Sequence, residues 1–166
     1  MAIDRSRGLW VVLLSFFGAF VLAIVSLPDF LPDYLAYARP SWVALVLFYW
    51  IISLPHRFGL VAAWISGLIL DVLQGGLLGQ QALAFLVVGY IAASLYQRMR
   101  MFSVWQQSMI IFAAMFVAEM IIFVIELTTM DRPWKNLYML PPIVSALLWP
   151  WVFLFLRYLR RRFNVY

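Results

Sequence analysis

The sequence predicts an all-α fold: a polytopic membrane protein built as a bundle of six transmembrane helices. Three observations lead to this prediction. Hydrophobic residues make up 66% of the 166 residues, a fraction too high for a soluble domain of this length. The apolar residues fall into six runs that are separated by short polar turns. The density of arginine alternates from one turn to the next, as expected of a chain that crosses a bilayer repeatedly.

The composition also excludes several classes of function. The chain has no cysteine, which excludes a disulfide framework, an iron–sulfur cluster and thiol catalysis. With a single histidine in addition, it offers few ligands for zinc, and we expect neither a metal nor a cofactor. The net charge of +5 comes from arginines at helix ends, so it indicates membrane topology rather than binding to nucleic acid.

We expect a single transmembrane domain, residues 1–166, because no polar segment is long enough to fold independently. The six helices are expected at about 9–27, 41–54, 58–73, 77–96, 104–127 and 137–156. The first is interpreted as a retained helix, since no convincing cleavage site for a signal peptide follows it.

Ser41 is a candidate N-cap for the second helix, which ends just before Pro55. About 14 residues give this helix a length of roughly 20 Å, against about 30 Å of hydrocarbon in a bilayer. The second helix must therefore either pack inside the bundle or thin the bilayer around it.

The third and fourth helices form a hairpin that we expect to be the centre of the fold. Gly67 and Asp71 are four residues apart, so they share one face of the third helix. A carboxylate in an apolar helix costs a few kcal/mol against lipid, and it should face protein, water or a partner. Small residues at steps of three and four predict a packing seam near the hairpin turn, which also contains Gly76. The seam consists of Gly75, Gly79, Ala82, Gly89 and Ala93.

The fifth helix carries Glu119 and Glu126 one heptad apart. Helix lengths place Asp71 and Glu119 in the outer half of the membrane. Three interpretations of these two acids are open: a proton or cation site, a catalytic role, or hydrogen bonding inside the bundle. Gln74, Gln80 and Gln81 are nearby candidate partners. The sequence favours internal hydrogen bonds, because no cation or nucleophile accompanies the acids in the outer half.

The positive charges predict the orientation of the bundle. Nine arginines fall on one side: Arg5, Arg7, Arg57, Arg98, Arg100, Arg157, Arg160, Arg161 and Arg162. The other side receives Arg39, Arg132 and Lys135. Short loops with an excess of arginine and lysine stay in the cytoplasm, so both termini are expected there. The arginines near the C-terminus would also attract anionic membrane lipids.

Two further groups of residues are candidate contacts to a partner. Ser15, Ala19 and Ala23 place small side chains along the first helix, where another helix can approach. Pro55, His56 and Arg57 form a turn on the cytoplasmic side. The histidine could make a pH-sensitive contact, although a polar turn after a helix-stopping proline is the simpler interpretation. Glu119 is a third candidate contact because of its place inside an apolar helix.

The segment from Arg39 to Gln107 resembles MreD, the family of rod-shape-determining membrane proteins of bacteria. Three motifs carry the resemblance: LPHR at 54–57, G-x-x-x-D from Gly67 to Asp71, and GGLLG from Gly75 to Gly79. Chain length and the expected number of helices also agree with this family. The resemblance implies a non-enzymatic component of the inner (cytoplasmic) membrane that supports lateral peptidoglycan synthesis and rod shape.

The resemblance also implies partners and an alternative. MreD-like proteins associate with MreC, a bitopic membrane protein, and through it with the glycosyltransferase RodA, a class B penicillin-binding transpeptidase and MreB. The family is similar to the six-helix substrate-binding subunit (S-component) of energy-coupling-factor vitamin transporters.

Two functions therefore stay open. The main hypothesis is a scaffold whose surface holds the membrane helix of another protein. The alternative is a transporter subunit that binds a small molecule, which requires an outward-opening pocket of convergent polar groups. The outer loops show no obvious polar cluster of this kind, which favours the scaffold. An intramembrane hydrolase is the least favoured, since the sequence offers no nucleophile–base pair.

Overall fold

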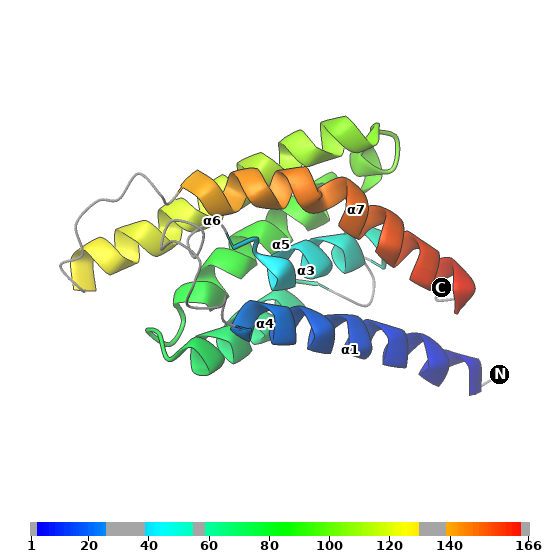
Figure 1. Cartoon of the computed structure of the whole chain (residues 1–166), viewed down its shortest axis with the longest axis horizontal. Coiled ribbons are helices and arrows are strands. Elements are labelled where there is room, and N and C mark those ends of the chain that lie inside the picture. The colour runs from blue at the N-terminus through cyan, green and yellow to red at the C-terminus, as the bar shows by residue number, and fades with distance from the viewer. Residues whose placement is uncertain (1–2, 26–38, 55–58, 130–138, 164–166) are drawn as a thin grey trace.

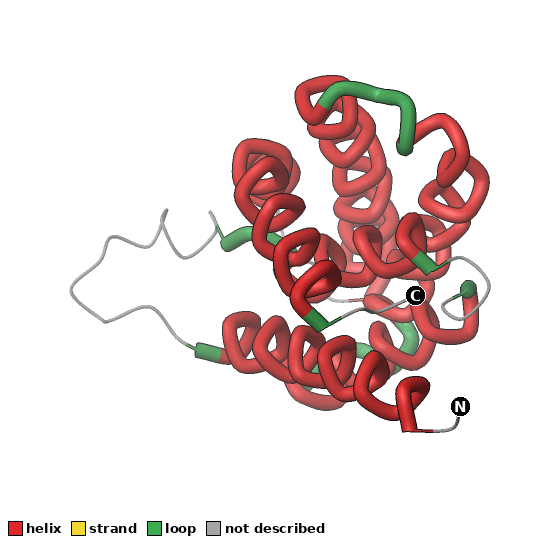
Figure 2. Tube along the Cα trace, turned by 90° about the vertical axis from the view of Figure 1, so that its right-hand side faces the viewer, coloured by secondary structure: helices red, strands yellow, loops and turns green. Residues whose placement is uncertain are grey.

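The computed structural model describes residues 3–25, 39–54, 59–129 and 139–163, and all regular structure within them is helical (Figure 2). The described helices are α1 (Ile3–Ile24), α3 (Trp42–Ser53), α4 (Leu60–Gln74), α5 (Gln80–Met99), α6 (Val104–Thr129) and α7 (Leu140–Arg162). Three of them, α5, α6 and α7, are long and apolar enough to cross a membrane. The apolar part of α1 (Leu9–Ile24), α3 and α4 are shorter.

The helices at the two ends of the chain differ most from the expected boundaries. The first begins at Ile3 rather than near residue 9, and the last continues to Arg162 rather than ending near residue 156. Hydropathy marks only the part of a helix that suits hydrocarbon, whereas arginine is a good helix former outside it. Both helices therefore extend beyond their apolar segments.

The most enclosed helix of the bundle is α3, and the expectation that the α4–α5 hairpin forms the centre was wrong. All of α3 from Val43 to Ser53 is buried. Its neighbours are α1, α5 and α7, with a smaller contact to α4 (Figure 1). A helix that is apolar on every side has no face suited to water or headgroups, so it is stable only inside protein or lipid. Of the two arrangements open for this short helix, the structure shows packing inside the bundle.

The start of α3 is tied to α7 in a way that the sequence did not reveal. Ser41 precedes the helix as expected, but its side chain makes no capping hydrogen bond. Its backbone N–H instead donates to Oγ of Ser145 at 3.0 Å. Aromatic contacts continue this packing, because the ring of Phe48 meets Trp149 edge to face at a centroid distance of 5.7 Å.

The contact between α4 and α5, which form a hairpin, is the most extensive between any two described helices. Even so, α4 lies at the edge of the bundle. One face of α4 packs against α5 through buried Ala63, Gly67 and Asp71. Its opposite face exposes large apolar side chains, among them Val61 and Val72. An apolar exposed face of this kind suits contact with lipid.

The described ends of the chain lie together. In both views the start of α1 and the end of α7 are at the same end of the molecule (Figures 1 and 2). An even number of membrane crossings requires this arrangement.

Candidate functional site

The buried carboxylate of Asp71 is bonded through both of its oxygens to the start of α5. Oδ2 accepts a hydrogen bond from the N–H of Gly79 at 2.8 Å and a longer one from Ala82 at 3.4 Å. Oδ1 accepts from the N–H of Gln81 at 2.9 Å. One carboxylate thus serves three of the N–H groups that a helix leaves unpaired at its N-terminus.

The Asp71 side chain of α4 therefore caps the N-terminus of α5, whose N-cap residue is Gly79. The remaining N–H at this end, that of Gln80, donates to the carbonyl of Leu77 at 3.1 Å. A negative charge at a helix N-terminus also interacts favourably with the helix dipole. Of the three interpretations of Asp71, this geometry supports internal hydrogen bonding. Its partners are backbone N–H groups, however, and not the glutamine side chains that the sequence suggested.

Gly67 accounts for the other half of the G-x-x-x-D pattern. A Cβ atom at this position would lie 2.3 Å from Cα and 2.6 Å from the backbone nitrogen of Ala82. Any side chain would therefore push the start of α5 away from α4. Asp71 lies one turn further along the same face and would then lose its N–H partners. The two residues together hold the hairpin closed.

The other glycines of the predicted packing seam have two different roles. Gly89 is a close-packing residue, since a Cβ there would lie 2.8 Å from Cβ of Ala63. Gly75 and Gly79 have no atom within 4 Å of such a Cβ, and neither has Gly76. The φ angles of Gly75 and Gly79 are 65° and 100°, in the left-handed region that glycine adopts readily. These two glycines shape the turn, and their assignment to the seam was wrong.

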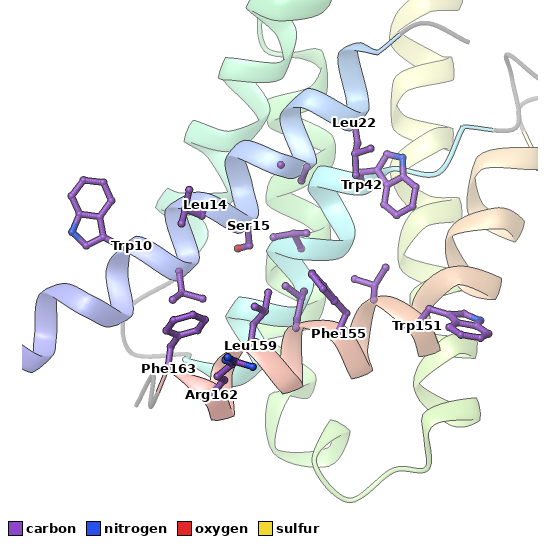
Figure 3. A pocket seen from close by; sticks show the side chains of 16 residues that line it. Trp10, Leu14, Ser15, Leu22, Trp42, Trp151, Phe155, Leu159, Arg162 and Phe163 are labelled. Atoms are coloured by element: carbon purple, nitrogen blue, oxygen red, sulfur yellow. The ribbon is translucent and has the colours of Figure 1, made fainter. Parts of the chain in front are cut away.

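A large apolar groove lies between α1 and α7, with α3 behind it (Figure 3). Its volume is about 920 Å³. Figure 3 shows Leu14 and Ser15 of α1 on the side of the groove opposite Phe155 and Leu159 of α7. Apart from Ser15 and Arg162, the side chains that line it are apolar. We call this surface the α1–α7 groove.

The small residues predicted on the first helix divide between two cavities. Ser15 and Ala19 line the α1–α7 groove, whereas Ala23 lines a second cavity. The hydroxyl of Ser15 accepts a hydrogen bond from Nε1 of Trp50 at 2.8 Å and donates to the carbonyl of Val12 at 2.7 Å. Because its hydrogen bonds are used inside the bundle, Ser15 contributes shape to the groove more than polarity.

The second cavity, of about 280 Å³, lies where α1 and α4 end and where α3, α5 and α7 begin. We call it the polar cavity. Six of its lining residues are polar or charged: Arg39, Ser41, Gln74, Gln81, Glu119 and Glu126. Nε of Arg39 is buried and has no hydrogen-bond partner in the part of the chain that the structure describes. Glu126 accepts a hydrogen bond from Nε2 of Gln80 at 3.2 Å.

The polar cavity could not be seen in the sequence. The prediction that no cation accompanies the acids in the outer half was wrong for Glu119, because Arg39 lines the same cavity. Eighty positions separate the two residues, so no local spacing could reveal their proximity. Asp71 does not line this cavity, so the two acids lie in separate sites. The remaining candidates Pro55, His56 and Arg57 lie outside the described residues.

Comparisons with known proteins settle the family. The model of the family described as rod shape-determining protein MreD matches residues 4–159. The chain belongs to the MreD family. A curated relative, the rod shape-determining protein MreD of Haemophilus influenzae, is 34% identical over 160 residues, which cover 95% of each of the two chains. No solved structure matches the chain.

Membership in the MreD family confirms the resemblance predicted from the three motifs and extends it over nearly the whole chain. The match covers all six described helices apart from the first residue of α1 and the last turn of α7. It connects this protein to the determination of cell shape. The apolar character of α5, α6 and α7 fits a membrane protein.

Proposed function

We propose that this MreD-family protein is a non-enzymatic scaffold of the cell-elongation complex in the bacterial inner membrane. It binds an MreC-like bitopic partner and, through it, supports peptidoglycan synthesis by a RodA-type glycosyltransferase and a class B penicillin-binding transpeptidase alongside MreB. The α1–α7 groove is the observation that carries this proposal. A bitopic protein has one membrane helix, and a groove with a helix on each side suits one helix.

The residues of the groove suit helix association in a bilayer. Lipid tails are as apolar as leucine, so membrane helices associate through close packing and a few hydrogen bonds. Gly18 and Ala19 let another backbone approach α1 closely, while Leu14 and Phe155 supply large contact surfaces. A Cβ atom at Gly18 would meet nothing within 4 Å, so this part of the groove is open.

The open position of Gly18 gives a direct test. We expect Gly18→Trp to fill the groove and to reduce recovery of an MreC-like partner about 5- to 150-fold, since overpacking costs about 1–3 kcal/mol. The fold should be kept, because the new side chain meets no atom of this chain near its Cβ. Co-purification from detergent, with the partner quantified by mass spectrometry, measures the effect.

The matched control is Val124→Trp, which places the same side chain on an exposed position of α6 away from the groove. It should leave partner recovery unchanged. Equal recovery with Gly18→Trp and the parent protein would show that the partner binds elsewhere.

In the proposed topology both termini lie in the cytoplasm. Two observations support it: the described chain ends lie together, and most arginines fall on the side of the bundle where those ends lie. We expect reporter fusions after Tyr166 and within residues 131–136 to report opposite sides of the membrane. The same signal from both positions would contradict a bundle with six crossings.

The polar cavity favours a second candidate function, an S-component-like subunit that binds a small molecule. Its volume of about 280 Å³ is just below the range of about 300–1,000 Å³ that is typical of ligand sites. The buried Nε of Arg39 is a donor that an anionic group can satisfy. Saturable binding of a water-soluble anionic metabolite that Arg39→Gln abolishes, together with unchanged partner recovery in Gly18→Trp, would favour this function over the scaffold.

A further inference from the structure

A third cavity, of about 450 Å³, lies at the end of the bundle where the chain termini are found. Four arginines line it: Arg100 after α5, and Arg157, Arg160 and Arg161 on α7. No acidic side chain is among its lining residues, so no carboxylate in the described part of the chain neutralises the four positive charges there. We call it the arginine cavity.

The sequence of α7 explains why three arginines share this cavity and a fourth does not. Residues 157, 160 and 161 follow the i, i+3, i+4 spacing that places side chains on one helical face. Arg162 falls on another face, where it lines the α1–α7 groove and donates a hydrogen bond to the hydroxyl of Tyr158 at 2.6 Å. The arginines at the end of α7 therefore line two different cavities, the arginine cavity and the α1–α7 groove.

Arg100 completes the rim from the opposite side. It follows the last residue of α5, and its Nη2 lies 3.5 Å from the backbone carbonyl of Ser53 at the end of α3. The rim is thus built from three parts of the chain that are distant in sequence. A patch formed only by the last turn of one helix would not have this closed form.

The floor of the arginine cavity is held by a network of buried polar groups. Nε2 of Gln107 donates to the carbonyls of Met99 at 2.9 Å and Phe102 at 3.2 Å, which fixes the turn that carries Arg100. Oε1 of the same side chain accepts a hydrogen bond from Nε1 of buried Trp149 at 3.2 Å. Because every polar group of this network is paired, the cavity keeps its shape without a ligand.

We propose that the arginine cavity binds a phosphate group, and that its occupant is the phosphodiester of an anionic membrane lipid. Arginine presents a planar fork of donors that matches phosphate oxygens in bidentate geometry. Four such groups around one cavity with no carboxylate provide charge and donors for one phosphate head group.

The position of the cavity favours a lipid over a free anion. Its lining residues come from the ends of α3 and α5, the start of α6, and the middle and end of α7, and its four arginines lie at the ends of α5 and α7. On the proposed topology, on which this inference rests, these ends lie at the level of the cytoplasmic head groups. Basic cavities between membrane helices on this side suit anionic head groups. Apolar walls that include Ile52 and Phe153 suit the first part of an acyl chain.

Native mass spectrometry of the full chain in a non-ionic detergent tests the site, with phosphatidylglycerol and phosphatidylcholine as probes. We expect phosphatidylglycerol to bind at least about tenfold more tightly than phosphatidylcholine. Arg100→Gln and Arg160→Gln should each weaken phosphatidylglycerol about fivefold, which corresponds to about 1 kcal/mol per charge near an anionic surface. The control Arg98→Gln removes an exposed charge two positions from Arg100 that does not line the cavity, and it should have no effect.

Three outcomes would overturn the proposal. Equal affinity for phosphatidylglycerol and phosphatidylcholine would show that the cavity does not recognise an anionic lipid. An equal loss of phosphatidylglycerol affinity in Arg98→Gln would show only diffuse attraction of the lipid to the positively charged surface. Displacement of phosphatidylglycerol by low millimolar inorganic phosphate would assign the site to a free anion instead of a lipid. If a glutamine variant fails to fold, Arg100→Lys and Arg160→Lys keep the charge and test the bidentate fork. The lipid preference of the parent protein decides the question independently, and it does not depend on recovery of an MreC-like partner.

Discussion

Replacing Asp71 tests the closing of the hairpin most directly. Asp71→Leu removes both acceptor oxygens, and with them the three hydrogen bonds from the N–H groups of Gly79, Gln81 and Ala82. Asp71→Asn keeps one acceptor oxygen, but its amide group places a donor opposite an N–H that is itself a donor. We therefore expect the leucine variant to be clearly less stable than the asparagine variant.

The contacts give the size of the effect. Each unpaired buried donor costs about 1–3 kcal/mol, and two of the three bonds to Asp71 are short, at 2.8 and 2.9 Å. Half-exposed Gly79 can recover part of this cost from water. Hydrogen bonds between membrane helices also average only about 0.6 kcal/mol when measured. We expect a loss of about 3–4 kcal/mol for leucine and about 1–2 kcal/mol for asparagine.

Equilibrium unfolding in mixed micelles, followed by circular dichroism, measures these differences. A loss of 3–4 kcal/mol lowers the folding equilibrium constant roughly 100- to 1000-fold. Val72→Ala, at the neighbouring exposed position, is the control and should stay within about 0.5 kcal/mol of the parent protein. Parent-like stability of Asp71→Leu would refute the capping role. If both variants fold well yet abolish cell-shape function equally, the charge itself is required and the ion-coupled interpretation gains.

Two further predictions concern the closely packed parts of the bundle. Gly67→Ala should destabilise the hairpin by about 1–3 kcal/mol because its Cβ would overlap the backbone of Ala82, whereas the control Gly18→Ala should be neutral. Thermal unfolding in detergent compares the two variants. Equal melting temperatures would contradict the close approach of α4 and α5 at Gly67. Gln107→Leu should cost about 1–3 kcal/mol by leaving Nε1 of Trp149 without its acceptor, and a parent-like melting temperature would contradict the network beneath the arginine cavity.

The sequence was most informative where local pattern decides structure. Apolar runs located the helices, and the G-x-x-x-D pattern correctly drew attention to Gly67 and Asp71. The pattern could not show that the carboxylate caps the next helix, since this depends on the path of the turn between them. Small residues at regular steps were also ambiguous, because Gly89 is selected by a neighbouring side chain and Gly79 by its own backbone angle.

The cavities could not be predicted, because they form between helices that are distant in sequence. Arg39 and Glu119 line one cavity only after the start of α3 and the middle of α6 are placed in one bundle. The arginine cavity likewise joins Arg100 to the last turns of α7. The arginines predicted the membrane topology from the sequence. Their positions in the sequence did not show which of them would line the same cavity.

The enclosed position of α3 has a consequence for synthesis of the protein. Of the helices that pack against α3, α7 is the last to be synthesised. It ends at Arg162, which is 109 residues after Ser53. At about 5–20 residues per second, a ribosome needs roughly 5–20 s to complete that neighbour after α3 has emerged. During this interval α3, with only 12 residues, is too short to span the bilayer and lacks part of its protein surroundings. Membrane integration of this chain is therefore expected to be cooperative, with α3 taking its final depth only when the later helices arrive.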